Sequence, residues 1–185
     1  MKNVLVVLSG PSGVGKGTIA KKLIKRNKDF FLSVSCTTRS PRQGEVNAKD
    51  YFFISKPEFK EKIENGGFLE YSEHFENFYG TPREFVETKL QSKDVLLEID
   101  VNGGLNVKAN YPKAILIMIA PPSEEELYAR LIGRATESEE KIKLRMSRLN
   151  FELSQSDKYD YTVVNDDLQK AIEQIEEIIK YEKNK

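Results

Sequence analysis

The sequence predicts an α/β fold in which a five-stranded parallel sheet is flanked by helices. Five short apolar runs are spread along the 185 residues, and segments with helical periodicity lie between them. Four of these runs are continuous rather than alternating between apolar and polar residues, which is typical of parallel strands that are covered on both faces. Because strands alternate with helices, we expect right-handed crossovers within one sheet.

The expected strands are residues 4–8, 31–35, 95–99, 114–120 and 161–164. Helices are expected after the glycine-rich loop near the N-terminus, at the capping box that starts at Ser123, at Thr136, and after the last strand. A further short helix is expected to start at Ser55. The apolar residues of the four longer helices repeat every three or four positions. They are Ile19, Ala20, Leu23 and Ile24; Leu127 and Leu131; Ile142, Met146, Leu149 and Leu153; and Leu168, Ile172, Ile175 and Ile179.

Length and composition indicate one soluble globular domain with room for inserted lobes. Lys and Arg total 29, as do Asp and Glu, so the zero net charge gives no support for general affinity for nucleic acid or anionic lipid. The longest apolar runs are too short to cross a bilayer. A single cysteine, Cys36, excludes an internal disulfide and suits a reducing compartment. We therefore expect a cytoplasmic protein without a nucleic-acid, membrane or protein partner.

The segment GPSGVGKGT lies between the first strand and the first helix and has the composition of a phosphate-binding loop. In such a loop successive backbone N–H groups converge, the helix N-terminus adds unpaired donors, and glycines allow close approach to phosphate oxygens. The segment matches the G-x-x-x-x-G-K part of the P-loop in its required strand–loop–helix context. The predicted site comprises Gly10, Pro11, Ser12, Gly13, Val14, Gly15, Lys16, Gly17 and Thr18, with Lys16 reaching the terminal phosphates.

The loop departs from the usual pattern at Gly17, where Ser or Thr normally offers a hydroxyl to Mg²⁺. Two interpretations stay open. Either Thr18 approaches the phosphates or the metal from the adjacent turn, or water and nucleotide oxygens hold most of the metal. Mg²⁺ retains several waters readily, so both interpretations allow a metal. Nucleoside monophosphate kinases often carry the G-K-G-T form, which favours a small-substrate kinase over a switch GTPase.

The segment between the second and third expected strands is rich in Arg, Tyr, Glu and turn residues, which suggests an inserted lobe. Arg39 and Arg42 lie three residues apart, and a guanidinium binds phosphate through a rigid fork. A single carboxylate such as Glu70 can accept hydrogen bonds from N1–H and the amino group of guanine, whereas adenine has no donor at N1. Two arginines with Tyr51 and Tyr79 beside that carboxylate are what a nucleoside monophosphate needs.

Several motifs in register resemble the guanylate kinase family. They follow that family's order across nearly the whole chain and read GPSGVGKGT, SCTTRSPRQGEVNAKDYFF, GGFLEY, FYGTP, LLEIDVNG, RLIGRATESEEKIKLRM and VVNDD. The resemblance implies Mg²⁺-dependent transfer of the γ-phosphoryl group of ATP to GMP, and also to dGMP, in purine nucleotide metabolism. It also implies a P-loop kinase core with a GMP-binding lobe and a helical lid. The implied segments are a core at 1–34, 84–125 and 150–185, a GMP lobe at 35–83 and a lid at 126–149.

The resemblance further implies roles for residues at the matching positions. Guanine would meet Ser35, Glu70 and Thr81, and the GMP phosphate would meet Arg39, Arg42, Tyr51 and Tyr79. Other residues near GMP would be Glu98, Asp100 and Arg148. Catalytic roles would go to Lys16, Asp100, Arg134 and Arg145, and the ATP site would add Arg130 and Asn165. The metal would meet Thr18 and Asp100, with water and phosphate oxygens as its other ligands.

Simpler interpretations of these residues stay open. Thr81 could be the N-cap of a following helix, and Glu70 could be a solvated surface carboxylate. Tyr51 could belong to the core of the lobe. For Arg130 and Arg148, a surface ion pair is an equal alternative to phosphate contact.

Two positions depart from the family's pattern without removing a proposed contact. Ala48 stands where glycine is usual, and Asn102 stands where glutamine is usual. Two other functions are also considered. One is a kinase of the same build for another acceptor, such as AMP or a sugar phosphate. The other is a guanylate-kinase-like scaffold module that binds peptides, although such modules have usually lost the phosphate loop that Lys16 completes here.

Overall fold

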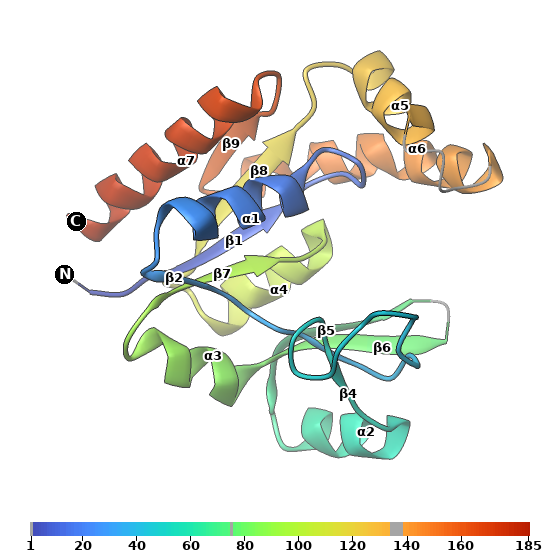
Figure 1. The fold of residues 1–185 in the computed structure, drawn as a ribbon, viewed down its shortest axis with the longest axis vertical. Coiled ribbons are helices and arrows are strands. Elements are labelled where there is room, and N and C mark those ends of the chain that lie inside the picture. The colour runs from blue at the N-terminus through green and yellow to red at the C-terminus, as the bar shows by residue number, and fades with distance from the viewer. Residues whose placement is uncertain (1, 75, 134–138) are drawn as a thin grey trace.

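The computed structural model describes residues 2–74, 76–133 and 139–185, and its central feature is a five-stranded parallel sheet (Figure 1). The strand order is β2-β7-β1-β8-β9. Every neighbouring pair is parallel, as in the register of Leu5 with Val95 and of Val6 with Ile115. The predicted sheet is therefore confirmed. Its strands are β1 (Leu5–Ser9), β2 (Phe30–Leu32), β7 (Asp94–Glu98), β8 (Ile115–Ala120) and β9 (Tyr161–Val164).

The second expected strand is shorter than predicted. It was expected at residues 31–35, but β2 pairs with β7 only from Phe30 to Leu32. The backbone N–H of Ser33 still donates to the carbonyl of Leu96, at 2.9 Å, and the chain then leaves the sheet. Ser35 lies in the connection between β2 and β3, the first strand of a second sheet. The alternation of apolar and polar residues that predicted a strand at 31–35 therefore continues past the end of β2.

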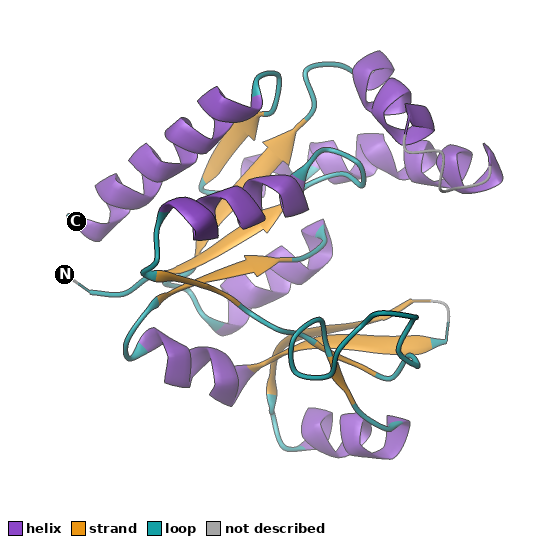
Figure 2. Cartoon of the chain, in the orientation of Figure 1, coloured by secondary structure: helices purple, strands orange, loops and turns teal. Residues whose placement is uncertain are grey.

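Helices cover both faces of the central sheet, as Figure 2 shows. Along β1, Val6 and Leu8 belong to one buried cluster, whereas Leu5 and Val7 belong to the other. This alternation explains why the strand is apolar throughout. The first cluster includes residues of α1 (Lys16–Arg26), α5 (Glu124–Gly133), α6 (Glu139–Ser154) and α7 (Leu168–Lys183). The second includes residues of α3 (Arg83–Leu90) and α4 (Val101–Asn110).

A second, four-stranded sheet forms a separate layer below the first in Figure 1, and the sequence did not reveal it. Its order is β4-β3-β6-β5, and α2 packs on it through the buried ring of Phe59. At Gly80, an added Cβ would lie 2.9 Å from Cδ1 of Phe68, so the close ring packing requires glycine. The elements are β3 (Cys36–Thr37), β4 (Phe52–Phe53), α2 (Lys56–Glu64), β5 (Phe68–His74) and β6 (Asn77–Pro82).

The expected helix starts are confirmed where the structure describes them. The Ser55 hydroxyl accepts a hydrogen bond from the backbone N–H of Glu58, whose carboxylate accepts from the backbone N–H of Ser55. The backbone N–H of Glu126 donates to the Ser123 hydroxyl at 3.2 Å. The predicted start at Thr136 lies outside the described residues. Among the helices of the described ranges, none is long and apolar enough to cross a membrane.

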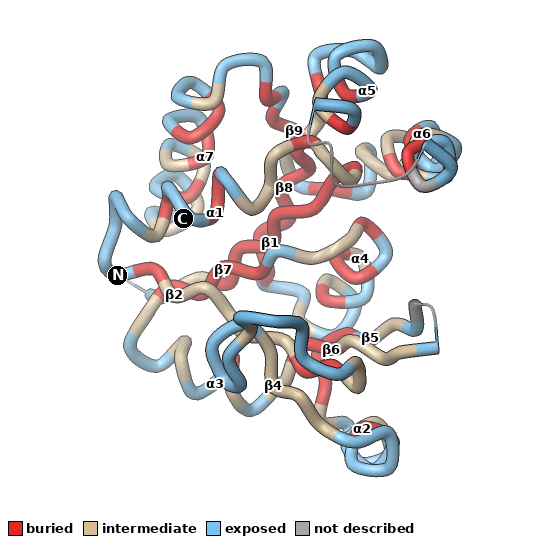
Figure 3. The backbone as a smooth tube through the Cα atoms, turned by 45° about the vertical axis from the view of Figure 1, so that its right-hand side comes forward, coloured by how far each residue is buried: buried red, intermediate tan, exposed pale blue. Residues whose placement is uncertain are grey.

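The central strands β1, β7 and β8 are the most buried part of the sheet, whereas α2 and α6 keep wide exposed faces (Figure 3). A 3-10 turn, Ser156–Lys158, joins α6 to β9. The polypeptide enters the second sheet after β2 and returns to the first through α3. The division of the chain at residues 35, 84, 126 and 150 stays a prediction.

Candidate active site

The glycine-rich loop turns tightly between β1 and α1. Gly10, Gly13 and Gly15 have φ values of 144°, 91° and 105°, which side chains disfavour. An added Cβ at Gly10 would lie 2.1 Å from the carbonyl oxygen of Ile119, so the loop packs directly on β8. The N-cap of α1 is Gly15, which provides no capping side chain for the first-turn amides. Those N–H groups are therefore available to an anion at the helix N-terminus.

The Lys16 side chain folds over the loop it follows. Its Nζ donates to the carbonyl oxygens of Gly10 at 2.6 Å and of Pro11 at 3.1 Å. The ammonium group is thereby held at the mouth of the ring of backbone amides. Phosphate oxygens bound by those amides would lie within reach of this charge.

The position after the lysine faces a carboxylate. An added Cβ at Gly17 would lie 3.1 Å from Oε1 and 3.3 Å from Oε2 of Glu98. The Glu98 side chain is solvent-accessible, but the surrounding walls of the site partly desolvate it and raise its pKa, while Lys16 and Lys21 oppose the rise. Glycine at position 17 therefore leaves room for Glu98, a reason that sequence spacing could not reveal. Thr18, the third residue of α1, lies in the same first turn and is exposed.

One pocket lies beside the loop and has a volume of about 420 Å³. Its walls combine the loop with residues from distant elements: Gly13, Val14, Gly15, Thr18, Arg130, Gly133, Asn165, Asp166 and Leu168. Asn165 is buried, and its Nδ2 donates to the carbonyl of Val14 at 2.7 Å. Arg130 donates through Nη1 to the carbonyl of Asn165, at 3.0 Å, and through Nε to Glu126, at 3.1 Å. The ion pair that was the alternative for Arg130 exists, and the same side chain also lines the pocket.

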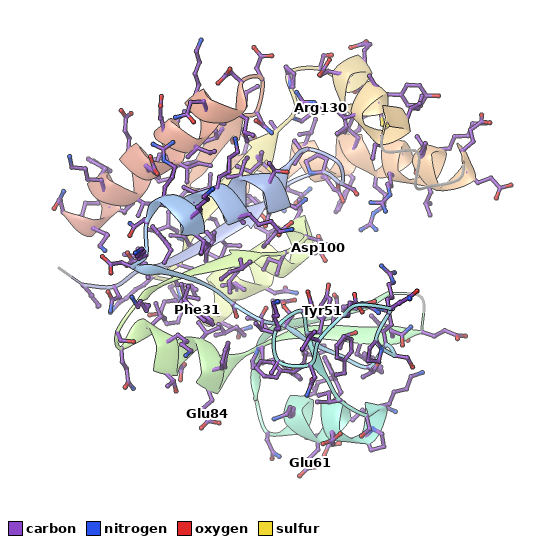
Figure 4. All side chains as sticks on the ribbon, in the orientation of Figure 1. Phe31, Tyr51, Glu61, Glu84, Asp100 and Arg130 are labelled. Atoms are coloured by element: carbon purple, nitrogen blue, oxygen red, sulfur yellow. The ribbon has the colours of Figure 1, made fainter. Side chains whose placement is uncertain are left out.

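A second pocket, of about 390 Å³, lies between the two sheets. It brings together seven of the residues that the sequence associated with GMP, from both sheets and their connections. The lining residues are Ser35, Arg42, Tyr51, Glu70, Ser72, Tyr79, Gly80, Glu98, Ile99 and Asp100. Ser72 was not predicted, although it lies two residues after Glu70 on the same strand and therefore on the same face. In Figure 4, Asp100 and Tyr51 lie on facing parts of the two layers, and Arg130 lies on α5, the first helix of the expected lid.

Glu70 is the buried acid of this second pocket. Its side chain is only 6% exposed, and the Thr81 hydroxyl donates to its Oε1 at 2.6 Å. Burial raises the pKa of Glu70 to about 7, the Thr81 hydrogen bond partly offsets the rise, and Asp100 adds to it. The surface alternative for Glu70 is therefore wrong. The N-cap alternative for Thr81 is also wrong, since α3 is preceded by Pro82 and the Thr81 hydroxyl points across the hairpin to Glu70.

Asp100 ends the β7 connection and caps the next helix. Its Oδ1 accepts from the backbone N–H of Gly103 at 2.9 Å. An added Cβ at Gly103 would lie 3.2 Å from Oε2 of Glu70. The two carboxylates therefore flank the start of α4, and a glycine at position 103 allows them to do so. The hydroxyl of Ser9 donates to the carbonyl of Asp100 at 3.2 Å, which ties this turn to the end of β1.

The two arginines of the predicted phosphate clamp lie in the connection between β3 and β4. Arg42 and Tyr79 line the second pocket, while the guanidinium of Arg39 lies 5.4 Å from the ring centre of Tyr51. Tyr51 and Tyr79 pack edge to face at 6.1 Å, and burial raises the pKa of Tyr51. Arg39 also pairs with Glu45, a residue that sequence reasoning missed.

The residues predicted on the lid are only partly described. Arg134 lies outside the described residues, and Arg145 and Arg148 lie on α6. Nε of Arg148 is 3.9 Å from Oε1 of Glu152, a buried carboxylate that was not predicted. Burial raises the pKa of Glu152, and the charges that act on it include Arg148, Lys16, Asp100 and Arg145.

Comparisons with known proteins agree with this arrangement. The sequence model of the family described as guanylate kinase matches residues 2–182. The guanylate kinase of Caldanaerobacter subterraneus subsp. tengcongensis is 51% identical over 183 residues, covering 98% of this chain and 89% of the relative. That of Clostridium tetani is 50% identical over 183 residues, covering 98% and 88%.

Solved structures extend the comparison to three dimensions. The crystal structure of guanylate kinase from Anaplasma phagocytophilum has a TM-score of 0.78 and 35% identity, covering 100% of this chain and 88% of that one. A shikimate kinase from Bacteroides thetaiotaomicron, with a TM-score of 0.57 at 14% identity, shares the fold alone. Since the family model matches nearly the whole chain and relatives are about half identical along it, the chain belongs to the guanylate kinase family.

Proposed function

We propose that this chain transfers the γ-phosphoryl group of ATP to GMP, and to dGMP, yielding ADP and the corresponding diphosphate. One observation supports this most directly. The buried pair of Glu70 and Thr81 faces a pocket that shares Glu98 and Asp100 with the edge of the sheet where the phosphate loop begins. Ligands of open parallel sheets bind at the carboxyl ends of the strands, where the two pockets lie. We place this reaction in purine nucleotide metabolism, in the cytoplasm.

ATP would bind through the loop and the pocket beside it. The α1 amides and Lys16 would meet the β- and γ-phosphates, because they form a cluster of donors next to a positive helix end. The adenosine part would occupy the pocket lined by Arg130 and Asn165. The Asn165 amide already donates to Val14, so it would hold the loop as well as shape the pocket.

Guanine would bind against Glu70. An ionised Glu70 offers acceptors to N1–H and the amino group, while Thr81 and Ser35 would complete the contacts around the base. Adenine would leave the buried carboxylate facing an acceptor at N1. A buried polar group left unpaired can lower kcat/KM for the wrong base by roughly 10⁴- to 10⁵-fold relative to the correct one.

The GMP phosphate would lie among Arg39, Arg42, Tyr51 and Tyr79. These side chains gather at one end of the second pocket, and Arg42, Tyr51 and Tyr79 line it directly. Guanidinium groups bind phosphate through paired N–H donors, and phenol hydroxyls add single donors. The base at Glu70 and the phosphate at the arginines would together fix the orientation of GMP.

Mg²⁺ suits this site if phosphate oxygens of the nucleotide and water supply most of its ligands. Within the described residues, no three His, Cys, Asp or Glu side chains form a metal-binding group. Mg²⁺ keeps several waters and binds proteins through one or two oxygen ligands together with substrate phosphates. Asp100 and the Thr18 hydroxyl would offer those ligands, and Glu98 would orient bound water. The ion would supply charge neutralisation on the phosphate oxygens.

Positioning and charge would account for the transfer itself, because phosphoryl transfer needs no covalent intermediate on the protein. The two pockets would hold the GMP phosphate in line with the γ-phosphorus. Arg134, Arg145 and Arg148 would approach the transferring group when the lid closes. An added guanidinium there is worth about 10³ to 10⁵ in rate. Closure would also exclude water, which limits ATP hydrolysis.

A coupled assay of ADP formation with ATP and each nucleoside monophosphate tests this function. We expect rapid turnover with GMP and dGMP, turnover with AMP at the background rate, and loss of turnover in Lys16→Met. Preference for AMP or a sugar phosphate would identify a kinase of the same build with another acceptor. Peptide binding without any turnover would identify a scaffold module.

A further inference from the structure

Glu45 contacts the predicted phosphate clamp through both of its carboxylate oxygens. Nη2 of Arg39 donates to Oε1 at 2.8 Å, and Nη1 of Arg39 donates to Oε2 at 2.9 Å. The backbone N–H of Arg42 donates to the same Oε2 at 2.7 Å. One carboxylate therefore connects the two arginines whose spacing determines the shape of the clamp.

The turn that carries Glu45 is built to bring this carboxylate back toward the arginines. The backbone N–H of Glu45 donates to the carbonyl of Arg42 at 3.1 Å, which closes a tight turn. Gly44 has a φ of 87°, and nothing lies within 4 Å of an added Cβ. Glycine is therefore favoured there by the positive φ and not by a lack of space. The Glu45 side chain therefore bonds to the turn that presents it.

The bonds of Arg39 involve one edge of its guanidinium. Nη1 donates to Glu45 and to the carbonyl of Ser40 at 2.8 Å, and Nη2 donates to Glu45. A guanidinium has five N–H donors, and its second fork consists of Nε–H and the other Nη2–H. Arg39 also has a hydrogen bond with Tyr79, which raises its pKa after the bond with Glu45 and which uses a donor of this second fork. A phosphate would replace the Tyr79 oxygen as the acceptor there and could bind the second fork bidentately while the first stays on Glu45.

Partial burial distinguishes this pair from an ordinary surface ion pair. The side chains of Arg39 and Glu45 are 15% and 20% exposed, and the Arg39 guanidinium also lies near the rings of Tyr51 and Phe53. Arg39, followed by the Arg42 amide, holds the pKa of Glu45 down to about 2, so the carboxylate is ionised at every pH at which the protein would be assayed.

We propose that Glu45 is a positioning residue for the acceptor phosphate: it orients the Arg39 fork and fixes the Arg42 turn before GMP binds. This inference rests on the proposed phosphate clamp. The opposite arrangement, in which Glu45 competes with the phosphate for Arg39, would release Arg39 on binding. Because the two forks point in different directions, the same arginine can bind both anions.

Binding of GMP and of guanosine tests the inference, since guanosine has the base but no phosphate. Calorimetry would compare the parent with Glu45→Gln, Arg39→Ala and the double variant. Glu61→Gln is the matched control, because Glu61 lies exposed on α2 and points away from the site in Figure 4. We expect Glu45→Gln to weaken GMP binding by about 10- to 100-fold, the range for a hydrogen bond to a charged group. Guanosine binding should change by less than about twofold, since the contacts to the base are intact.

The double variant tests whether Glu45 acts through Arg39. If it does, Glu45→Gln should weaken GMP binding less once Arg39 is alanine, and the loss that remains would measure the contribution of the Arg42 turn. Glu45→Asp keeps the charge but shortens the side chain, and we expect it to lose part of the GMP affinity. It gives the same comparison if the Gln variant does not fold, which melting temperatures would reveal.

Each outcome has a separate meaning. Unchanged or tighter GMP binding in Glu45→Gln would overturn the positioning role, and so would an equal loss of guanosine binding. If Arg39→Ala bound GMP as the parent does, the phosphate clamp itself would fail. A large effect of Arg39→Ala without an effect of Glu45→Gln would leave the clamp intact and refute only the inference.

Discussion

Replacing Glu70 with Gln should make the protein more stable while it removes the guanine-binding acid. Glu70 is 6% exposed, and burial raises its pKa from the ordinary 4.5 to about 7. Below about pH 4.5 both the folded and unfolded chains are protonated at this residue. Between pH 4.5 and 7 the folded chain retains the proton and the unfolded chain has lost it, so the free energy of unfolding falls as pH rises. Above pH 7 the whole penalty for the buried charge is present.

The size of the penalty follows from the shift in pKa. A rise from 4.5 to about 7 corresponds to about 3 kcal/mol at pH 8, at 1.36 kcal/mol per unit. Gln has nearly the same shape, carries no charge and can still accept the hydrogen bond from Thr81. We therefore expect Glu70→Gln to raise the free energy of unfolding by about 3 kcal/mol at pH 8, which is roughly 6–12 °C in Tm for a chain of this size.

Thermal and urea unfolding of both proteins between pH 5 and pH 8 would measure this difference. The stabilisation should shrink as pH falls toward 5, and Glu61→Gln, which removes an exposed charge, should show neither effect. In the same variant, kcat/KM for GMP should fall by about 100-fold, because the amide presents a donor to guanine's donors. Equal stability of parent and variant at pH 8, or a difference that is the same at pH 5, would refute the reasoning.

Four further predictions follow from individual contacts. GMP binding by the parent should weaken about 10-fold from pH 8 to pH 6 as Glu70 takes up a proton, and guanosine titrations would separate this from ionisation of the substrate phosphate. Gly17→Ser and Gly17→Ala should each lower kcat/KM by about 10-fold, because the added Cβ would lie 3.1 Å from Oε1 of Glu98. A Ser variant that is more active than the parent during Mg²⁺ titration would contradict this. Ala48→Gly should raise the free energy of urea unfolding by about 1 kcal/mol, since Ala48 has a φ of 62°, and a less stable variant would disprove the strain. Asp94→Ala should lower the free energy of unfolding by about 3–5 kcal/mol, because buried Asp94 accepts hydrogen bonds from Lys183 at 2.7 Å and from the Val4 amide. The folded variant should keep its kcat, since Asp94 lies at the amino end of β7 and the two pockets lie at the carboxyl ends of the strands.

Predictions from the sequence were most accurate where the signal is local. The central sheet and the strand–loop–helix at Lys16 were predicted from apolar runs and glycine spacing, and the strand ends differ from the prediction by at most three residues. The second sheet was missed because β3 and β4 contain only two residues each, too few for a periodic pattern. The helix α4 was missed as well, since its first turn contains two glycines that normally disfavour a helix.

The amino-acid sequence by itself determined the phosphate loop, the alternation of strands and helices, and the family. These features depend on residues that are adjacent or regularly spaced along the chain. Only the tertiary structure decided which distant side chains meet. Asn165 contacts Val14 across 151 residues, Thr81 joins Glu70 across a hairpin, and the carboxylate of Glu98 lies against Gly17. Such contacts depend on how the sheet edges come together in space. The raised pKa of Glu70 likewise results from burial, which no residue has until the chain has folded.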